Sequence, residues 1–488
     1  MVAVWGGAVV AVINARKKGV AATTVRKISG LLTAASCSVL AADLQADSVS
    51  EATASGSDSA VNMTTATLKN KPNLGADEGL SSKADENSNW RVKTAVLSYS
   101  EEGRIQVNQA LLKVTRESDS GSLQFKVDTD TVTGPSMSAA VSSSEVQTFS
   151  NPSGSLETVT AAGELPEWVI ESHRRSSVSV NKEDILNSDY SINYGARYSY
   201  ELSYKSKSIT AGISRNFDRK NTQLSFSTLF EDAEVLPIGG VVKPGEKTII
   251  RADYTDEADF KTAWNNLRTG DSERKRAYEL VTGITQVINR DAIVQFNYSY
   301  GQVNGYQNDA IKLVSIIDAN GNPEANVYEN RPDHRERQSV YVHGKYSLAK
   351  NQVLDLSYRY YWDDWSINSH TVAAGWQFEL GSNWTLEPQV RWYKQSSADF
   401  FQQSIFADGA VAVIPDYMSA DYRLAATNNY TLGVNLDYKF DSGKALSMRL
   451  ALYEINPEDD SSSKRGRLNG IDLTPTIRST VFMMSYDF

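Results

Sequence analysis

The chain has 488 residues and a formal net charge of −10, an acidic balance that argues against nucleic acid as a partner. After residue 50 no run of about 18 apolar residues occurs, which excludes a helical membrane span in the body of the chain. The only cysteine, Cys37, lies in a candidate export segment, and the four histidines lack metal-ligand spacing, so we predict no disulfide, no metal and no other cofactor.

Residues 1–42 are predicted to be an export signal. A basic pair precedes the short apolar stretch Ile28–Leu40, and small residues then place the cleavage after residue 41 or 42. The earlier apolar run, Val2–Ile13, is too short to span a bilayer as a helix. We expect translation to start further in, near Val20 or Val25.

Residues 43–89 are predicted to be a disordered periplasmic segment. They are mostly Ser, Ala, Thr and acidic residues and contain no aromatic side chain. Such a composition buries too little apolar surface to offset the entropy of ordering. A plug or a partner-binding tail is the alternative. Order is expected to begin at Trp90.

From residue 90 to residue 488 the chain alternates polar and apolar residues in repeated runs. The clearest run, 193–204, places four tyrosines on one side and charged or small residues on the other. A period of two residues is typical of a β-strand with one apolar and one polar face. The first such run contains Ala95, Leu97 and Tyr99. The last ends at Phe488, with Phe482, Met484 and Tyr486 on the same face.

The connection lengths predict the topology. If the carboxyl end is periplasmic, alternate connections are short and every long loop lies on the other side, as in an outer-membrane barrel. Taking Tyr422–Phe440 as one strand, the count is about sixteen strands in an antiparallel up-and-down β-barrel, whose last strand would pair with Arg91–Tyr99. The short turns include 218–221, 289–291, 350–351, 381–383 and 441–443, and the long loops are 134–173, 232–273, 303–336, 395–420 and 456–471.

Tryptophan placement supports a membrane-spanning barrel. Trp384 and Trp392 lie eight residues apart on one face of one predicted strand. At a rise of about 3.3 Å per residue and a tilt near 45°, they are separated by about 19 Å along the membrane normal. This is close to the separation of the two aromatic girdles of such barrels.

Four stretches of the sequence carry a family resemblance. Asn330–Arg335, Ser357–Tyr361, Gln395–Phe401 and Ser419–Leu424 resemble a family of Gram-negative bacterial proteins of unknown function, described as probable outer-membrane barrels. The resemblance covers roughly residues 90–488. Members are often encoded near a flavin transferase, a small lipoprotein and thioredoxin-like proteins, which implies a lipoprotein or redox partner in the periplasm. The resemblance implies no catalytic residue.

Two groups of residues are candidate sites. Asp333, His334 and Arg335 lie in a predicted outer loop and form either a site for a metal or an anionic ligand, or a network that orders the loop. Charged residues on the lumen-facing side of the strands either select a permeant solute or neutralise one another across the lumen. This lumen-facing set consists of Arg197, Glu201, His343, Lys345, Asp355, Arg359, Glu387, Arg391, Asp437, Lys439 and Arg449.

An enzyme is the least supported alternative. A lipolytic barrel needs a serine, a histidine and an orienting residue within reach of one another. His370 falls on the predicted lipid-facing side with Ser366 nearby in sequence, but no third member is identifiable.

The sequence therefore predicts an outer-membrane barrel in contact with lipid, acting as a channel or as the membrane component of a transport or redox system. The alternative is a plugged barrel that serves as a scaffold or surface-interaction protein. The terminal Phe488 is predicted to be the signal read by the barrel assembly machinery.

Overall fold

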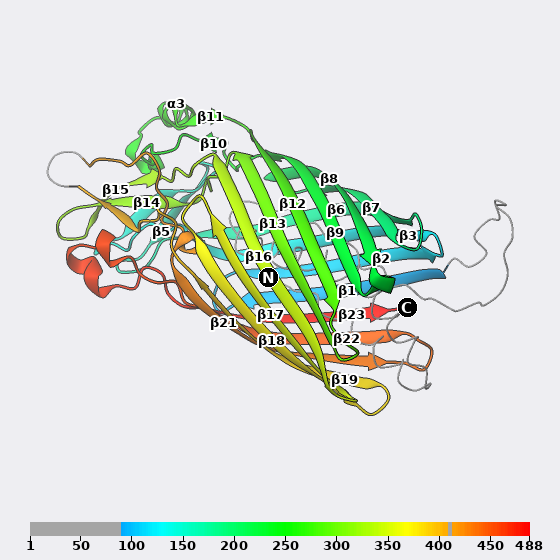
Figure 1. Cartoon of the computed structure of the whole chain (residues 1–488). Helices are drawn as coiled ribbons and strands as arrows, with labels where there is room; N and C mark the ends of the chain where they lie inside the picture. The colour runs from blue at the N-terminus through cyan, green and yellow to red at the C-terminus, as the bar shows by residue number, and fades with distance from the viewer. Residues whose placement is uncertain (1–88, 408–411) are drawn as a thin grey trace, which may run out of the picture.

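The computed structural model describes residues 89–407 and 412–488. Sixteen strands in this part of the chain form one closed, antiparallel barrel (Figure 1). The fold predicted from the alternating pattern is confirmed. In barrel order the strands are β1 (Asn89–Glu101), β2 (Gln106–Ser118), β3 (Gly121–Met137), β6 (Glu167–Ile185), β7 (Tyr190–Tyr200), β8 (Tyr204–Phe217), β9 (Thr222–Val235), β12 (Glu273–Val287), β13 (Ala292–Gly305), β16 (His334–Ala349), β17 (Gln352–Asp363), β18 (Asn368–Leu380), β19 (Trp384–Gln395), β21 (Thr427–Lys439), β22 (Ala445–Ile455) and β23 (Ile477–Asp487).

The barrel closes between its first and last strands. β1 pairs antiparallel with β23 in a continuous register that runs from Lys93 opposite Asp487 to Glu101 opposite Ser479. The predicted pairing of the terminal strand with Arg91–Tyr99 is therefore confirmed. Closure leaves no unpaired edge among the sixteen strands, so the ladder hydrogen bonds of every strand are satisfied on both sides.

The two ends of the barrel differ in their connections. At one end, which we call the turn end, no connection exceeds the five residues 440–444. Gly381 and Gly443 adopt positive φ angles of 75° and 87° there, a conformation that side chains with a Cβ rarely adopt. The other end, which we call the loop end, carries all the long connections. This asymmetry is the one predicted from the sequence.

One strand boundary differs from the prediction. Tyr422–Phe440 is not a single strand, because β21 begins only at Thr427. Tyr422–Leu424 instead form a turn of 3₁₀ helix, which Asp421 caps by accepting a hydrogen bond from the backbone N–H of Arg423. The number of strands is unaffected, because the extra residues belong to the preceding loop.

Apolar side chains cover the outer surface of most strands. Val127, Ile209 and Leu432 expose 48–60% of their surface, while the polar residues that alternate with such positions point inward. β1 departs from this pattern. Its alternating residues Leu97 and Tyr99 are buried inside the barrel, where they pack with Val481 and other apolar residues of β2, β3 and β22.

A row of aromatic rings lies at the turn end. Trp384, Tyr438, Phe440, Tyr486 and Phe488 follow one another with ring centroids 4.6, 4.7, 6.0 and 4.6 Å apart. They come from β19 and from the ends of β21 and β23, which do not follow one another in sequence. Such a row resembles the girdles that anchor membrane barrels at the headgroup level.

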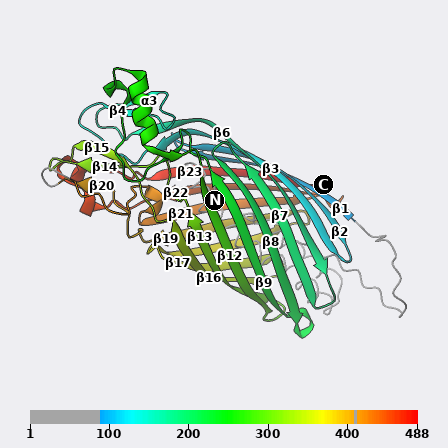
Figure 2. The same cartoon turned by 90° about the horizontal axis from the view of Figure 1, so that it is seen from above.

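The five long connections pack together at the loop end (Figure 2). We call them the loop cap: residues 138–166, 236–272, 306–333, 396–407 with 412–426, and 456–476. Their central element is a three-stranded sheet in the order β15-β14-β20. The elements of the cap are β4 (Gln147–Ser150), β5 (Glu157–Thr160), β10 (Val241–Val242), α3 (Glu257–Asn266), β11 (Arg268–Gly270), β14 (Leu313–Ile317), β15 (Pro323–Tyr328) and β20 (Ser404–Phe406), with short 3₁₀ turns between them.

The predicted export signal, 1–42, and residues 43–88 of the segment predicted to be disordered lie outside the described residues. Within the described part, none of the helices is long and apolar enough to cross a membrane.

Candidate functional site

The loop cap joins loops that start on well-separated strands. Lys312 follows β13 and donates a hydrogen bond from Nζ to the carbonyl oxygen of Met137, the last residue of β3, at 2.5 Å. Between these two strands the barrel order places β6, β7, β8, β9 and β12. A second bond, from the N–H of Val141 to Oγ of Ser315 at 2.9 Å, joins the same two loops. The loops therefore meet across the barrel mouth.

The cap has apolar cores of its own. Val314, Ile316 and Val327 of β14 and β15 pack with Met418 and Ile405 of the loop before β21, and all five are at most 5% exposed. Burial of this many apolar side chains is the main stabilisation available to a loop region. The cap is consequently a packed layer rather than a set of independent loops.

Charged side chains that are buried or nearly so join two loops of this layer. Arg331 donates from Nη2 to Asp421 Oδ2 at 2.7 Å, and its Nε lies 2.7 Å from Glu329 Oε1. Arg423 donates from Nε to Asp421 at 2.8 Å and from Nη2 to Asp309 at 3.1 Å. We call these five residues the ion cluster. It connects the loop between β13 and β16 with the loop between β19 and β21.

Burial shifts the acid–base equilibria of the ion cluster. Burial alone would raise the pKa of Asp421, but the cations around it hold that pKa well below its usual range. These cations are Arg423, Lys312 and Arg331. Glu329 behaves differently: burial raises its pKa to about 7, and the adjacent Arg331 offsets the shift only in part.

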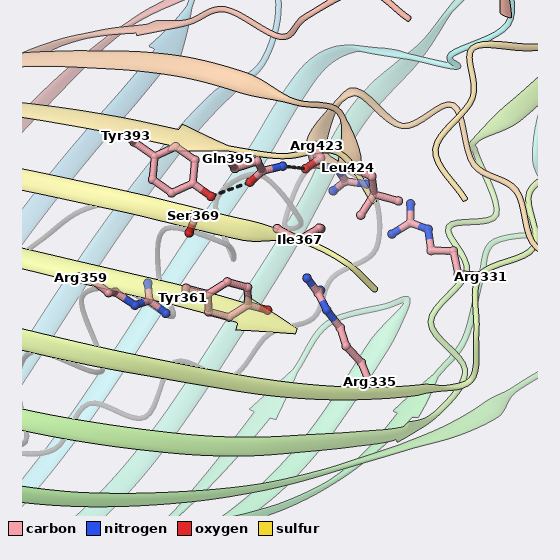
Figure 3. Close-up of a pocket in the computed structure, with 10 residues that line it drawn as sticks. All are labelled: Arg331, Arg335, Arg359, Tyr361, Ile367, Ser369, Tyr393, Gln395, Arg423 and Leu424. Atoms are coloured by element: carbon pink, nitrogen blue, oxygen red, sulfur yellow. Dashed lines mark hydrogen bonds between the residues drawn. The ribbon is translucent and has the colours of Figure 1, made fainter. Parts of the chain in front are cut away.

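A cavity lies directly beneath the ion cluster, between the cap and the barrel wall (Figure 3). It leaves about 50 Å³ for the centres of water-sized molecules. Because about 10–15 Å³ is enough for one water, the space admits several waters or one small solute. The lining consists of Arg331, Arg423 and Leu424 from the cap and of Arg335, Arg359, Tyr361, Ile367, Ser369, Tyr393 and Gln395 from β16–β19 and the turn before β18.

Seven of these ten lining residues come from the four stretches that carry the family resemblance. Asn330–Arg335 contributes two, Ser357–Tyr361 two, Gln395–Phe401 one and Ser419–Leu424 two. Segments that are up to 90 residues apart in sequence thus meet around one space.

The predicted lumen-facing residues are placed on the inner side of the wall, and several of them pair. His343 Nε2 and Lys345 Nζ each lie 2.9 Å from a different oxygen of Asp355. Arg391 donates to the hydroxyl of Tyr453 at 2.8 Å. Only Arg359 lines the cavity. Arg197 lies 3.6 Å from Asp128, and Glu201 lies 3.5 Å from His173. Glu387 accepts a hydrogen bond from Gln389. The remaining members, Asp437, Lys439 and Arg449, lie on β21 and β22.

The structure does not bring Asp333, His334 and Arg335 together. Arg335 faces the cavity and donates from Nε and Nη2 to Asp363, at 2.9 and 2.6 Å. His334 Nδ1 lies 2.8 Å from the side-chain oxygen of Asn304, while the Asp333 side chain is exposed. Successive strand residues point to opposite faces, which separates His334 from Arg335.

The side chains weighed for a lipolytic site are also apart from the cavity. His370 is exposed, with Nδ1 2.8 Å from the hydroxyl of Tyr358 and its ring against Tyr360. Ser366 lies in the turn before β18 with a φ angle of 67°.

Sequence reasoning missed two charged networks. Asp128 of β3 lies 3.2 Å from Lys126 Nζ and accepts a hydrogen bond from Ser177 at 2.8 Å. The alternation of polar and apolar residues along β3 indicates that the side chain of Asp128 points inward. The ion cluster had no comparable signal, because its members lie in loops without periodicity.

The predicted assembly signal, Phe488, is 55% exposed at the turn end. Its N–H donates to the carbonyl oxygen of Val92 at 2.9 Å, which extends the pairing of β23 with β1 to the last residue.

The structure is similar to those of two solved receptors and a solved channel. A mutant of the ferric enterobactin receptor PfeA from Pseudomonas aeruginosa matches at 11% identity and a TM-score of 0.39, over 75% of this chain and 53% of the receptor. The siderophore receptor PirA from Acinetobacter baumannii matches at 9% identity and a TM-score of 0.38, over 76% of this chain and 53% of the receptor. The CymD monoaromatic hydrocarbon channel matches at 8% identity and a TM-score of 0.35, over 82% of this chain and 87% of the channel. The chain thus spans about half the length of the two receptors. No curated protein matches it.

The part of the chain that the structure describes is a closed antiparallel β-barrel of sixteen strands. A family model described as "Protein of unknown function (DUF3570)" matches residues 29–488, and the chain belongs to that family.

Proposed function

We propose that the protein is a channel of the bacterial outer membrane whose outer mouth is closed by the loop cap. The observation that carries the proposal is the meeting of loops from well-separated strands over the mouth, through Lys312 and Met137. In this arrangement the loop end faces the medium and the turn end faces the periplasm.

The outer surface supports the membrane location. Apolar side chains such as Val127 of β3, Ile209 of β8 and Leu432 of β21 lie exposed on strands far apart around the barrel. A soluble protein rarely exposes so extended an apolar surface, whereas a lipid bilayer covers it. The aromatic row from Trp384 to Phe488 would then lie at the periplasmic headgroup level.

The inner surface supports a channel rather than an enzyme. Charged side chains of both signs line the wall, as in the triad of His343, Lys345 and Asp355. Polar walls favour water and solutes in the lumen of a sixteen-stranded barrel. The redox or lipoprotein partner implied by the family resemblance stays a prediction.

The second candidate is a permanently closed barrel that acts as a scaffold. The packed cores of the cap favour it, because Val314, Ile316 and Met418 bury themselves as completely as residues of a soluble domain. In that case the outer surface of the cap is the working surface, and the lumen carries no current.

Single-channel recordings of the purified protein in planar bilayers test the proposal. A closed channel is expected to show long silent periods interrupted by openings to one reproducible conductance. Complete silence from protein that is folded, judged by a shift in gel migration between unheated and boiled samples, would favour the scaffold.

A further inference from the structure

All the lining residues of the cavity beneath the ion cluster that carry a formal charge are arginines. Four of its ten lining residues are arginines, and none is aspartate or glutamate. The carboxylates that pair with these arginines, Asp363 and Asp421 among them, do not line the cavity. They hold the guanidinium groups in position and offset part of their charge, while the charged groups that border the cavity itself are the arginines.

The arginines approach the space from two sides. Arg331 and Arg423 come from the cap, and Arg335 and Arg359 come from the wall strands β16 and β17 (Figure 3). Two of them are also fixed by rings: the Arg335 guanidinium lies 4.3 Å from the ring of Trp365, and that of Arg359 lies 5.3 Å from the ring of Tyr361. Fixed guanidinium groups lose little entropy when they bind a ligand.

The remaining lining groups are polar and neutral. The Tyr393 hydroxyl donates to Gln395 at 2.5 Å, and the Gln395 amide donates to the carbonyl oxygens of Arg423 and Ala425 at 2.9 and 2.8 Å. This chain of hydrogen bonds ties β19 to the cap at the edge of the cavity. The cavity therefore depends on the cap being in place.

We propose that this cavity is a binding site for one small oxyanion, of the class of inorganic phosphate, sulfate or a short carboxylate. Guanidinium groups bind such anions through paired N–H···O bonds, which a halide cannot accept in the same geometry. The volume fits an anion of a few heavy atoms. The inference that such an anion is the solute of the channel rests on the proposed function. The inference that the cavity binds the anion does not.

Isothermal titration of the detergent-solubilised full chain at constant chloride concentration tests the site. Phosphate, sulfate and succinate are titrated in separate arms. We expect saturable binding of at least one of them, with one site per barrel. Absence of saturable binding in all three arms at concentrations of about 10 mM would overturn the proposal.

Substitution of a wall arginine locates the site. Arg359→Gln removes a cation from the lining without touching the cap, and it should weaken binding about tenfold or more. Arg359→Lys keeps the charge but loses the planar fork, and should weaken binding less. Arg215→Gln is the matched control, because Arg215 lies on β8 beside the Tyr190 ring and outside the cavity.

Equal weakening by Arg359→Gln and Arg215→Gln would overturn the proposal, since it would indicate general attraction by positive charge. If Arg359→Gln does not fold, Arg335→Lys and Arg335→Gln are titrated instead. Anion binding by both variants with the affinity of the wild type would then overturn the proposal. The titration measures binding independently of any current through the barrel. Binding without conductance in the bilayer recordings would therefore reject only the proposed channel. Conductance without binding in the titration would reject only the proposed anion site.

Discussion

Lys312 donates a hydrogen bond to the carbonyl oxygen of Met137 at 2.5 Å, although the strands that these residues adjoin are separated by five others in the barrel. The contact places two loops from well-separated parts of the wall over the same mouth. Lys312 is completely buried there, and its ammonium lies 5.8 Å from the ring of Tyr422 in a third loop. The closed state of the proposed channel depends on such contacts between loops.

Asp421→Asn should loosen the cap. The change leaves the buried Arg331 and Arg423 without the carboxylate that both contact, and removing one partner of a buried ion pair costs about 3–5 kcal/mol. We expect trypsin to cut the cap loops of the variant several times faster than those of the wild type, while the barrel strands resist.

Asp416→Asn is the control for this experiment. Asp416 belongs to the same loop but is exposed. Unchanged cutting rates in both variants would contradict the assigned role of the ion cluster.

The cap should loosen as the pH rises from about 5 to about 8. Burial raises the pKa of Glu329 to about 7, so the folded cap binds this proton more tightly than the open loop does. Stability from this group is therefore full in acid and is lost as the pH rises through 7. Asp309, whose pKa burial also raises, acts in the same direction, whereas the lowered pKa of Asp421 matters only in stronger acid.

Hydrogen exchange of the cap amides at several pH values, corrected for the intrinsic rates, measures this dependence. The groups around Glu329 are Arg331, Asp309, Asp421 and the Ser419 hydroxyl. Glu329→Gln imitates the protonated form and should remove most of the dependence. A variant with the same pH profile as the wild type would contradict the assignment to Glu329.

Asp355→Ala should destabilise the wall. It leaves His343 and Lys345, each 2.9 Å from the carboxylate, facing one another without it. The temperature at which the barrel loses its folded gel mobility should fall by several degrees. Ser357→Ala on the same strand tests for a general effect of substitution, and an equal fall in both variants would argue against a specific role of the triad.

Deletion of Phe488 should lower the amount of protein in the outer membrane several-fold before it affects any transport. The terminal N–H extends the pairing with β1, and the ring ends the aromatic row. Phe440→Ala removes another ring of that row but leaves the carboxyl end intact. Normal membrane levels of the truncated protein, measured by immunoblot of outer-membrane fractions, would refute the role as an assembly signal.

The barrel could be predicted from sequence because strand faces repeat every two residues. That periodicity, together with the connection lengths, is sufficient to predict the strand count and the two different ends. It misleads at Leu97 and Tyr99, where apolar residues pack inside the barrel rather than against lipid. A repeating pattern of polarity does not distinguish these two apolar surroundings.

The cap and the cavity could not be predicted in the same way. Arg331 and Asp421 lie 90 residues apart in loops, and Lys312 and Met137 lie 175 residues apart. Contacts of this kind depend on where the closed barrel places each loop and leave no periodic signal in the chain. The three residues 333–335, predicted to form one site, do not do so, because strand geometry directs only Arg335 into the cavity.

Paired recordings of wild-type protein and Asp421→Asn in planar bilayers test the gated channel most directly. We predict mostly silent wild-type barrels and a variant that is open for much of the time at the same unit conductance. A folded variant that stays silent would contradict this prediction, and so would a wild type with a large conductance that never closes.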